Sequence, residues 1–239
     1  MELTVIRPDQ GEDRRLGEVL CAALKERSEV RVIRTAEELE TAVRQRSLEG
    51  QRILFAAALG KSGINLTLYA MLEVLRLHPD CLKGSAAGIL VDGEGEFYTK
   101  SLGREIAQTA NGAGCWFVGR PLTEGTGSLR NYRVAASNHG CGLYEAYLWS
   151  ARDLVRRILS FQRPVYRHPK LLCLHSCNPS TSNTLQLWRE VRKNLSGQTE
   201  IQEISLRDGT VTDCAGCSYE MCMYFSRNSS CFYGGPIVE

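Results

Sequence analysis

The sequence contains one nearly continuous apolar run, Arg52-Ile53-Leu54-Phe55-Ala56-Ala57-Ala58-Leu59. A strand with one face in water alternates apolar and polar residues, and this run does not alternate. Strands that helices cover on both faces, as in parallel sheets, have such an uninterrupted pattern. We therefore expect residues 52–59 to form a central strand of a parallel β-sheet.

Strand-like and helix-like segments alternate on either side of this run. The other expected strands are 3–7, 30–34, 86–91 and 115–118, and the expected helices are 16–27, 35–45, 64–77, 102–109 and 142–159. Thr35-Ala36-Glu37-Glu38 begins the second of these helices as a capping box. Five strands with intervening helices predict a complete α/β doubly wound parallel sheet, with ligand loops at the carboxyl ends of the strands.

Residues 120–141 have neither a helical nor a strand pattern. A connection of 22 residues is longer than most loops of compact domains, and such loops are usually functional or disordered. A functional loop here would cover a ligand or pack against a second subunit. His139 within it is expected to be a surface or hydrogen-bonded loop histidine.

A second signal follows in residues 171–184, where an apolar strand leads through a polar loop into an amphipathic helix. Backbone N–H groups and the dipole at the start of a helix favour an anion there. The loop holds no lysine, so it suits a single phosphate monoester better than a nucleoside triphosphate. An ordinary polar turn is the alternative, because the same residue types cap helices and form turns. The candidate phosphate ligands are Ser176, Asn178, Ser180, Thr181, Ser182, Asn183 and Thr184.

The order of motifs in residues 170–239 resembles the flavodoxin-like NAD(P)H-dependent FMN reductases and the related iron–sulfur flavoproteins. The resemblance rests on the loop Ser176-Cys177-Asn178-Pro179-Ser180-Thr181-Ser182-Asn183-Thr184, a second strand near residues 201–206, and Asp213-Cys214-Ala215-Gly216-Cys217. The last segment resembles the Pro-Cys-x-Gly-Cys segment of that family. The resemblance implies that the loop holds the FMN phosphate and that NAD(P)H is the co-substrate.

Residues 1–165 also resemble a flavodoxin in their order of strands and helices, and Val118-Gly119-Arg120-Pro121 resembles the fifth strand of that fold. The turn at residues 8–15 has three carboxylates and no hydroxyl, so we expect this domain to be divergent and poor at binding FMN. The acidic loop 92–96 is expected to be a solvated turn.

The chain is thus expected to be a tandem arrangement with an incomplete second unit. Residues 170–239 would form the N-terminal half of a second flavodoxin-like unit. These 70 residues with two strands are too few to close a doubly wound sheet. We expect either a truncated sequence or a half unit that borrows its missing strands from elsewhere.

Four of the ten cysteines cluster near the end of the chain, with the spacing C-x2-C-x4-C-x8-C: Cys214, Cys217, Cys222 and Cys231. They are candidate ligands of an iron–sulfur cluster such as 4Fe-4S. Iron–sulfur flavoproteins place two residues between the second and third cysteines, whereas four intervene here. Zinc fits less well, because a four-cysteine zinc site usually uses two closely spaced pairs and only Cys214 and Cys217 form one. Reduced thiols packed near a flavin are the third alternative.

Composition narrows the partners. The formal net charge is +2 without a basic stripe, which argues against nucleic acid, and no apolar stretch is long enough for a membrane span. The N-terminus does not read as a signal peptide, so we expect a cytoplasmic protein.

The sequence favours an FMN-dependent NAD(P)H oxidoreductase that passes electrons to a small-molecule or protein acceptor, with no acid–base residue required. A homodimer is expected. The alternatives are a non-enzymatic flavodoxin-like scaffold or dimerisation protein without flavin, and an iron–sulfur electron-transfer flavoprotein.

Overall fold

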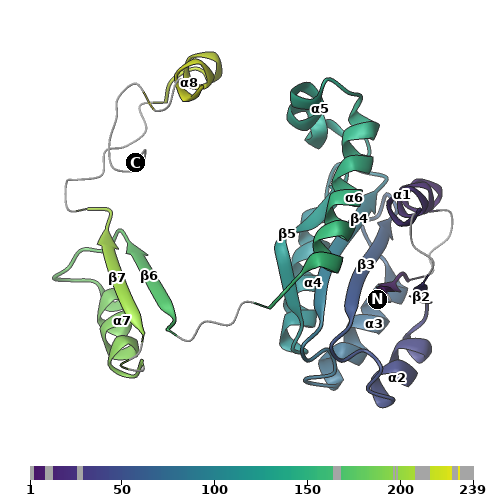
Figure 1. Cartoon of the computed structure of the whole chain (residues 1–239), viewed down its shortest axis with the longest axis horizontal. Helices are drawn as coiled ribbons and strands as arrows, with labels where there is room; N and C mark the ends of the chain where they lie inside the picture. The colour runs from purple at the N-terminus through teal and green to yellow at the C-terminus, as the bar shows by residue number, and fades with distance from the viewer. Residues whose placement is uncertain are drawn as a thin grey trace. The chain divides into compact units, whose positions relative to one another are not determined.

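The chain divides into two compact units, Met1–Gln162 and Arg163–Glu239, as seen in the computed structural model (Figure 1). The structure describes residues 3–8, 13–25, 29–163, 168–195, 197, 199–207, 216–227 and 231. None of the described helices is long and apolar enough to cross a membrane.

The first unit alternates strands and helices along the chain. Its strands are β1 (Leu3–Ile6), β2 (Val30–Ile33), β3 (Arg52–Leu59), β4 (Ala86–Gly93) and β5 (Trp116–Gly125). Its helices are α1 (Arg14–Leu24), α2 (Ala36–Arg44), α3 (Leu66–Leu77), α4 (Thr99–Gly112), the 3-10 helix η1 (Arg130–Tyr132), α5 (Arg133–His139) and α6 (Leu143–Ser160).

These five strands form one parallel sheet in the order β2-β1-β3-β4-β5. This is the strand order of flavodoxin-like doubly wound folds, which confirms the predicted fold class. As expected from its apolar run, β3 lies at the centre, between β1 and β4. The point at which the strand order reverses lies between β1 and β3, and ligand crevices of such sheets open at the carboxyl ends there.

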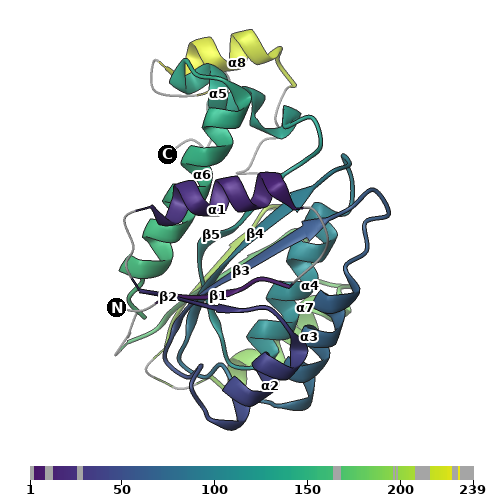
Figure 2. The same ribbon diagram turned by 90° about the vertical axis from the view of Figure 1, so that its right-hand side faces the viewer.

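Two hydrophobic clusters cover the two faces of this sheet. One contains side chains of α2, α3 and α4, and the other contains side chains of α1, η1, α5 and α6. Figure 2 shows α1 and α6 on one side of the sheet and α2, α3 and α4 on the other. Thr35 caps α2 as predicted, since its hydroxyl accepts a hydrogen bond from the backbone N–H of Glu38 at 3.3 Å.

The expectation of a long unstructured connection after residue 120 is wrong. Residues 120–141 contain the second half of β5, then η1 and α5. β5 is interrupted by a bulge, because Ala87 pairs with Phe117 but Ile89 pairs with Leu122. The bulge therefore broke the strand pattern at Val118, and the strand resumes beyond it.

The second unit contains β6 (Lys170–His175), α7 (Asn183–Lys193), β7 (Glu200–Ser205) and α8 (Tyr219–Ser226). β6 and β7 pair in parallel, with Leu171 opposite Ile201 and His175 opposite Ser205. This strand–helix–strand order agrees with the elements expected over residues 170–206. Leu172 and Leu174 of β6 are 54% and 58% exposed, so one face of this two-stranded sheet remains uncovered by the described residues.

Candidate functional site

The 176–184 loop joins the end of β6 to the start of α7, as the sequence predicts. Ser182 is the N-cap of α7, and its hydroxyl accepts a hydrogen bond from the backbone N–H of Leu185 at 3.2 Å. Leu185 is buried, at 3% exposure. The Ser182 side chain is therefore used to begin the helix.

Asn178 and Ser180 form a turn within the loop. The Asn178 side-chain oxygen accepts hydrogen bonds from the Ser180 backbone N–H at 3.0 Å and from the Ser180 hydroxyl at 2.8 Å. The Asn178 carbonyl accepts from the Ser182 N–H at 3.1 Å. These contacts fix the loop backbone, as side-chain amides do in turns.

The remaining candidate ligands are not committed to the turn. Among the described residues, no hydrogen bond involves the side chains of Ser176, Thr181, Asn183 or Thr184. The backbone N–H groups of Thr181, Asn183 and Thr184 likewise lack a partner in the described part of the chain. The seven candidates thus divide into three residues whose side chains form hydrogen bonds within the loop or cap α7, and four whose side chains have no partner among the described residues.

A polar cluster lies under α7, where Glu203 of β7 is the common partner. Its carboxylate accepts a hydrogen bond from the Trp188 indole at 2.9 Å, and His175 and Arg192 lie 3.4 and 3.5 Å from it. The hydrogen bond from Trp188 lowers the pKa of Glu203, and His175 and Arg192 act in the same direction. His175 is 10% exposed through its side chain, and its Nδ1 atom is buried with no hydrogen-bond partner among the described residues.

The cysteine cluster is described only in part. Cys214 lies outside the described residues, while Cys217 is half-buried and Cys222 and Cys231 are exposed. No group of three or more potential metal ligands occurs among the residues that the structure describes. Of the other cysteines, Cys81 and Cys115 are buried, and burial raises the pKa of the Cys81 thiol to about 11.

Of the expected solvated turn at residues 92–96, Glu94 and Glu96 are exposed as predicted, whereas Asp92 and Gly93 are buried at the end of β4. Asp92 is only 7% exposed, and the Nε atom of Arg15 donates to both of its carboxylate oxygens, at 3.0 and 2.9 Å. The hydroxyl of the fully buried Tyr147 donates to Asp92 at 2.9 Å. Burial raises the pKa of Asp92, while Arg15 and Tyr147 oppose that rise. The prediction that Asp92 is solvated was therefore wrong, because its partners Arg15 and Tyr147 lie on α1 and α6, far from it in the sequence.

The same Arg15 guanidinium holds two further loops. It donates to the carbonyl oxygen of Gly93 at 2.8 Å and to that of Gly127 at 3.1 Å. Asp13 is bound by Arg7 at 2.7 Å. A cavity of about 590 Å³ opens beside these groups, and Asp92 and Glu94 also line it. Arg14 and Arg15 of this cavity are paired with carboxylates, and Lys61 faces three carboxylates in the lining (Asp13, Asp92 and Glu94), so the cavity does not suit a phosphate dianion.

Two solved structures are similar in fold to this chain. Oxidised flavodoxin 2 from Bacillus cereus is 10% identical, with 66% of this chain and 98% of that chain covered and a TM-score of 0.46. A short-chain flavodoxin associated with a non-canonical PDU bacterial microcompartment is 14% identical, with 65% of this chain and 96% of that chain covered and a TM-score of 0.43. No model of a protein family matches the sequence, and neither does any curated protein. The flavodoxin-like topology follows from the strand order itself.

Proposed function

We propose that this chain is a flavin-binding oxidoreductase whose second unit holds the phosphate of FMN in the 176–184 loop, with NAD(P)H as the electron donor. One observation carries the proposal. The backbone N–H groups of Thr181, Asn183 and Thr184 have no partner among the described residues, at the start of a helix that directly follows a strand. Such groups, together with the helix dipole, bind phosphate.

The charge of the loop agrees with this role. Residues 176–184 contain no carboxylate and no lysine. A phosphate there would be held by N–H groups and by the hydroxyls of Ser176, Thr181 and Thr184, while Asn178 and Ser182 keep the loop in shape. Bound FMN would supply the hydride-accepting chemistry. The chain would contribute the position of its phosphate and the polarity around it.

A charge change at Thr181 tests the site. We expect FMN to bind the full chain with a Kd of about 1 μM or tighter, measured by quenching of flavin fluorescence. Thr181→Glu places a carboxylate in the loop proposed to hold the phosphate. It should weaken FMN binding by about tenfold or more, because the two negative charges repel each other. Thr181→Gln is the matched neutral control, since it has the same size, and should change the Kd by less than about threefold.

Two results would contradict the phosphate site. One is the absence of FMN binding by the parent chain, and the other is equal binding by the Glu and Gln variants. The redox part is measured separately, as oxidation of NADH or NADPH that requires added FMN. FMN binding without such oxidation would support the flavin site and contradict the reductase activity.

The internal contacts of the first unit favour a second candidate function, a flavin-free scaffold. Arg15 joins Asp92, Gly93 and Gly127 at the carboxyl edge, so that edge is held by the chain itself rather than by a ligand. A chain that takes up no FMN and has the same thermal stability with and without FMN would support the scaffold.

A further inference from the structure

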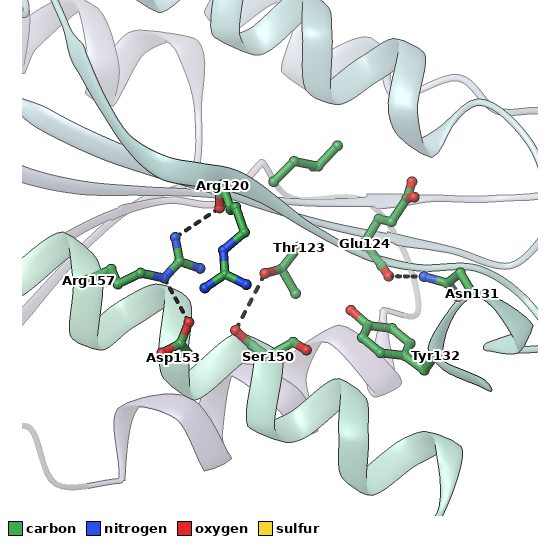
Figure 3. A pocket seen from close by; sticks show the side chains of 9 residues that line it. Arg120, Thr123, Glu124, Asn131, Tyr132, Ser150, Asp153 and Arg157 are labelled. Carbon is green, nitrogen blue, oxygen red and sulfur yellow. Dashed lines mark hydrogen bonds and ion pairs between the residues drawn. The ribbon is translucent and has the colours of Figure 1, made fainter. Parts of the chain in front are cut away.

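A crevice outside the sites described above lies between the edge strand β5 and helix α6, with η1 at one end (Figure 3). We call it the β5–α6 crevice. Its volume is about 250 Å³, which is enough for one small molecule and too little for a mononucleotide. Its lining residues are Arg120, Leu122, Thr123, Glu124, Asn131, Tyr132, Ser150, Asp153 and Arg157.

The backbone that forms one wall is strained. Residues 118–121 of β5 lie opposite Gly88 alone, and Arg120 within this bulge has a φ of 51°, in the left-handed region. A non-glycine residue is strained in this region, and such residues are concentrated at functional sites. Arg157 holds the bulge in place, because it donates to the carbonyl oxygens of Gly119 and Arg120.

The charged groups of the crevice leave one positive charge without a partner. Arg157 binds Asp153 at 2.7 Å. Partial burial favours a higher pKa of Asp153, but hydrogen bonds from Arg156 and Arg157 outweigh this effect and hold the pKa below its ordinary value. Figure 3 shows the guanidinium of Arg120 directed toward α6, and no hydrogen bond or ion pair of the described residues involves it.

The other acid of the crevice is directed elsewhere. The Glu124 carboxylate accepts a hydrogen bond from the Thr99 hydroxyl at 2.8 Å and lies 3.6 Å from Lys100, so α4 satisfies it. Only the backbone of Glu124 takes part in the crevice, where its carbonyl accepts from Asn131 at 2.7 Å. The crevice therefore has a net positive character.

The polar groups around Arg120 favour a ligand that accepts hydrogen bonds. Ser150 and Thr123 already donate to backbone carbonyls, at 3.0 and 3.5 Å. Burial raises the pKa of the Tyr132 phenol far above neutrality, so its hydroxyl keeps its proton and stays neutral. The Tyr132 ring and Leu122 provide apolar surface beside these groups.

We propose that the β5–α6 crevice binds a small organic carboxylate, with the Arg120 guanidinium as its partner. The planar guanidinium matches a carboxylate with two parallel hydrogen bonds. A single unpaired cation suits a ligand with one negative charge, and the apolar wall suits a ligand with a small apolar body.

Benzoate is the probe, and titrations of the full chain are followed by amide chemical shifts in NMR spectra. We expect saturable shifts at residues of β5 and α6. Benzamide is the neutral molecule of the same shape. It should bind at least about tenfold more weakly than benzoate, because it lacks the charge that pairs with Arg120. Arg120→Asn removes the guanidinium, and asparagine tolerates the left-handed backbone. It should weaken benzoate binding by about tenfold.

Arg46→Asn is the matched control, because Arg46 has a φ of 54° but is paired with Glu49 at 2.7 Å. Its effect on the Kd should stay within about twofold, because Arg46 does not line the crevice. The proposal is overturned if benzoate produces no saturable shift in the crevice, if Arg120→Asn binds as the parent does, or if inorganic phosphate binds more tightly than benzoate. Should Arg120→Asn fail to fold, the comparison of benzoate with benzamide on the parent chain decides.

Discussion

The guanidinium of Arg15 on α1 and the carboxylate of Asp92 at the end of β4 form a nearly buried ion pair, 77 residues apart in the sequence. Their side chains are 27% and 10% exposed. Removing one member of such a pair leaves the other charge buried without a partner. Arg15→Met should therefore lower the free energy of unfolding of the first unit by about 3 kcal/mol, measured by urea unfolding of the full chain.

The matched control for this variant is Arg14→Met, one position earlier on the same helix. Arg14 pairs with Glu18 on the surface and is 90% exposed through its side chain. Its loss should change the free energy of unfolding by less than about 0.5 kcal/mol. Equal effects of the two variants would contradict a stabilising role of the Arg15–Asp92 pair.

The close approach of Gly127 to the loop after β4 gives the second prediction. A Cβ atom at Gly127 would lie 2.3 Å from the backbone oxygen of Glu94. The backbone N–H of Gly127 also donates to the carbonyl oxygen of Gly95 at 2.8 Å. Gly127→Ala should thus destabilise the first unit by about 2 kcal/mol in the same urea experiment. Gly95→Ala has nothing within 4 Å of the new Cβ atom and serves as the control. A neutral Gly127→Ala would show that the two loops can separate without cost.

The sequence predicted the central part of this fold well, and the reason is local. The seven consecutive apolar residues at 53–59 favour a strand that is covered on both faces, so β3 was identified as a central strand. β5 was cut short at residue 118 because Gly119, Arg120 and Pro121 form a bulge, and a bulge breaks the alternation that marks a strand. Arg120, the centre of the β5–α6 crevice, was missed for the same reason.

The sequence predicted which segment forms the candidate site. It did not predict which residues of that segment form the turn and which are left without a partner. A loop rich in hydroxyls between a strand and a helix signals N–H groups available to an anion. Which hydroxyls form the turn depends on the backbone path: Ser180 points back to Asn178, and Ser182 caps α7. Asp92 shows the opposite case, because Arg15 and Tyr147 reach it from segments that no local pattern connects.

The Glu203 cluster under α7 should respond to acid. Glu203 has a pKa below its ordinary value of 4.5, chiefly because it accepts a hydrogen bond from Trp188. A carboxylate with a lowered pKa in the folded state stabilises that state above its unfolded pKa, and this contribution is lost as the pH falls through the folded pKa. The Trp188 indole N–H signal should therefore shift below about pH 4.5 in NMR titrations.

Glu203→Gln is the matched variant for this titration, since it keeps the size of the side chain and removes its charge. The acid-dependent shift of the Trp188 signal should disappear in it. A shift that persists unchanged in Glu203→Gln would assign the titration to another group. Trp188→Phe identifies the signal among those of the three tryptophans of the chain.

The last prediction separates the turn-forming residues of the 176–184 loop from those available to a ligand. Ser182→Ala removes the N-cap of α7 and should destabilise that helix by about 1 kcal/mol. The Leu185 N–H donates its hydrogen bond to the Ser182 hydroxyl, so exchange of this amide proton should then be about fivefold faster. Thr181→Ala removes a hydroxyl that has no partner among the described residues, so the exchange rate at Leu185 should not change. If both variants accelerate exchange equally, Thr181 also supports the helix and is not reserved for an anion.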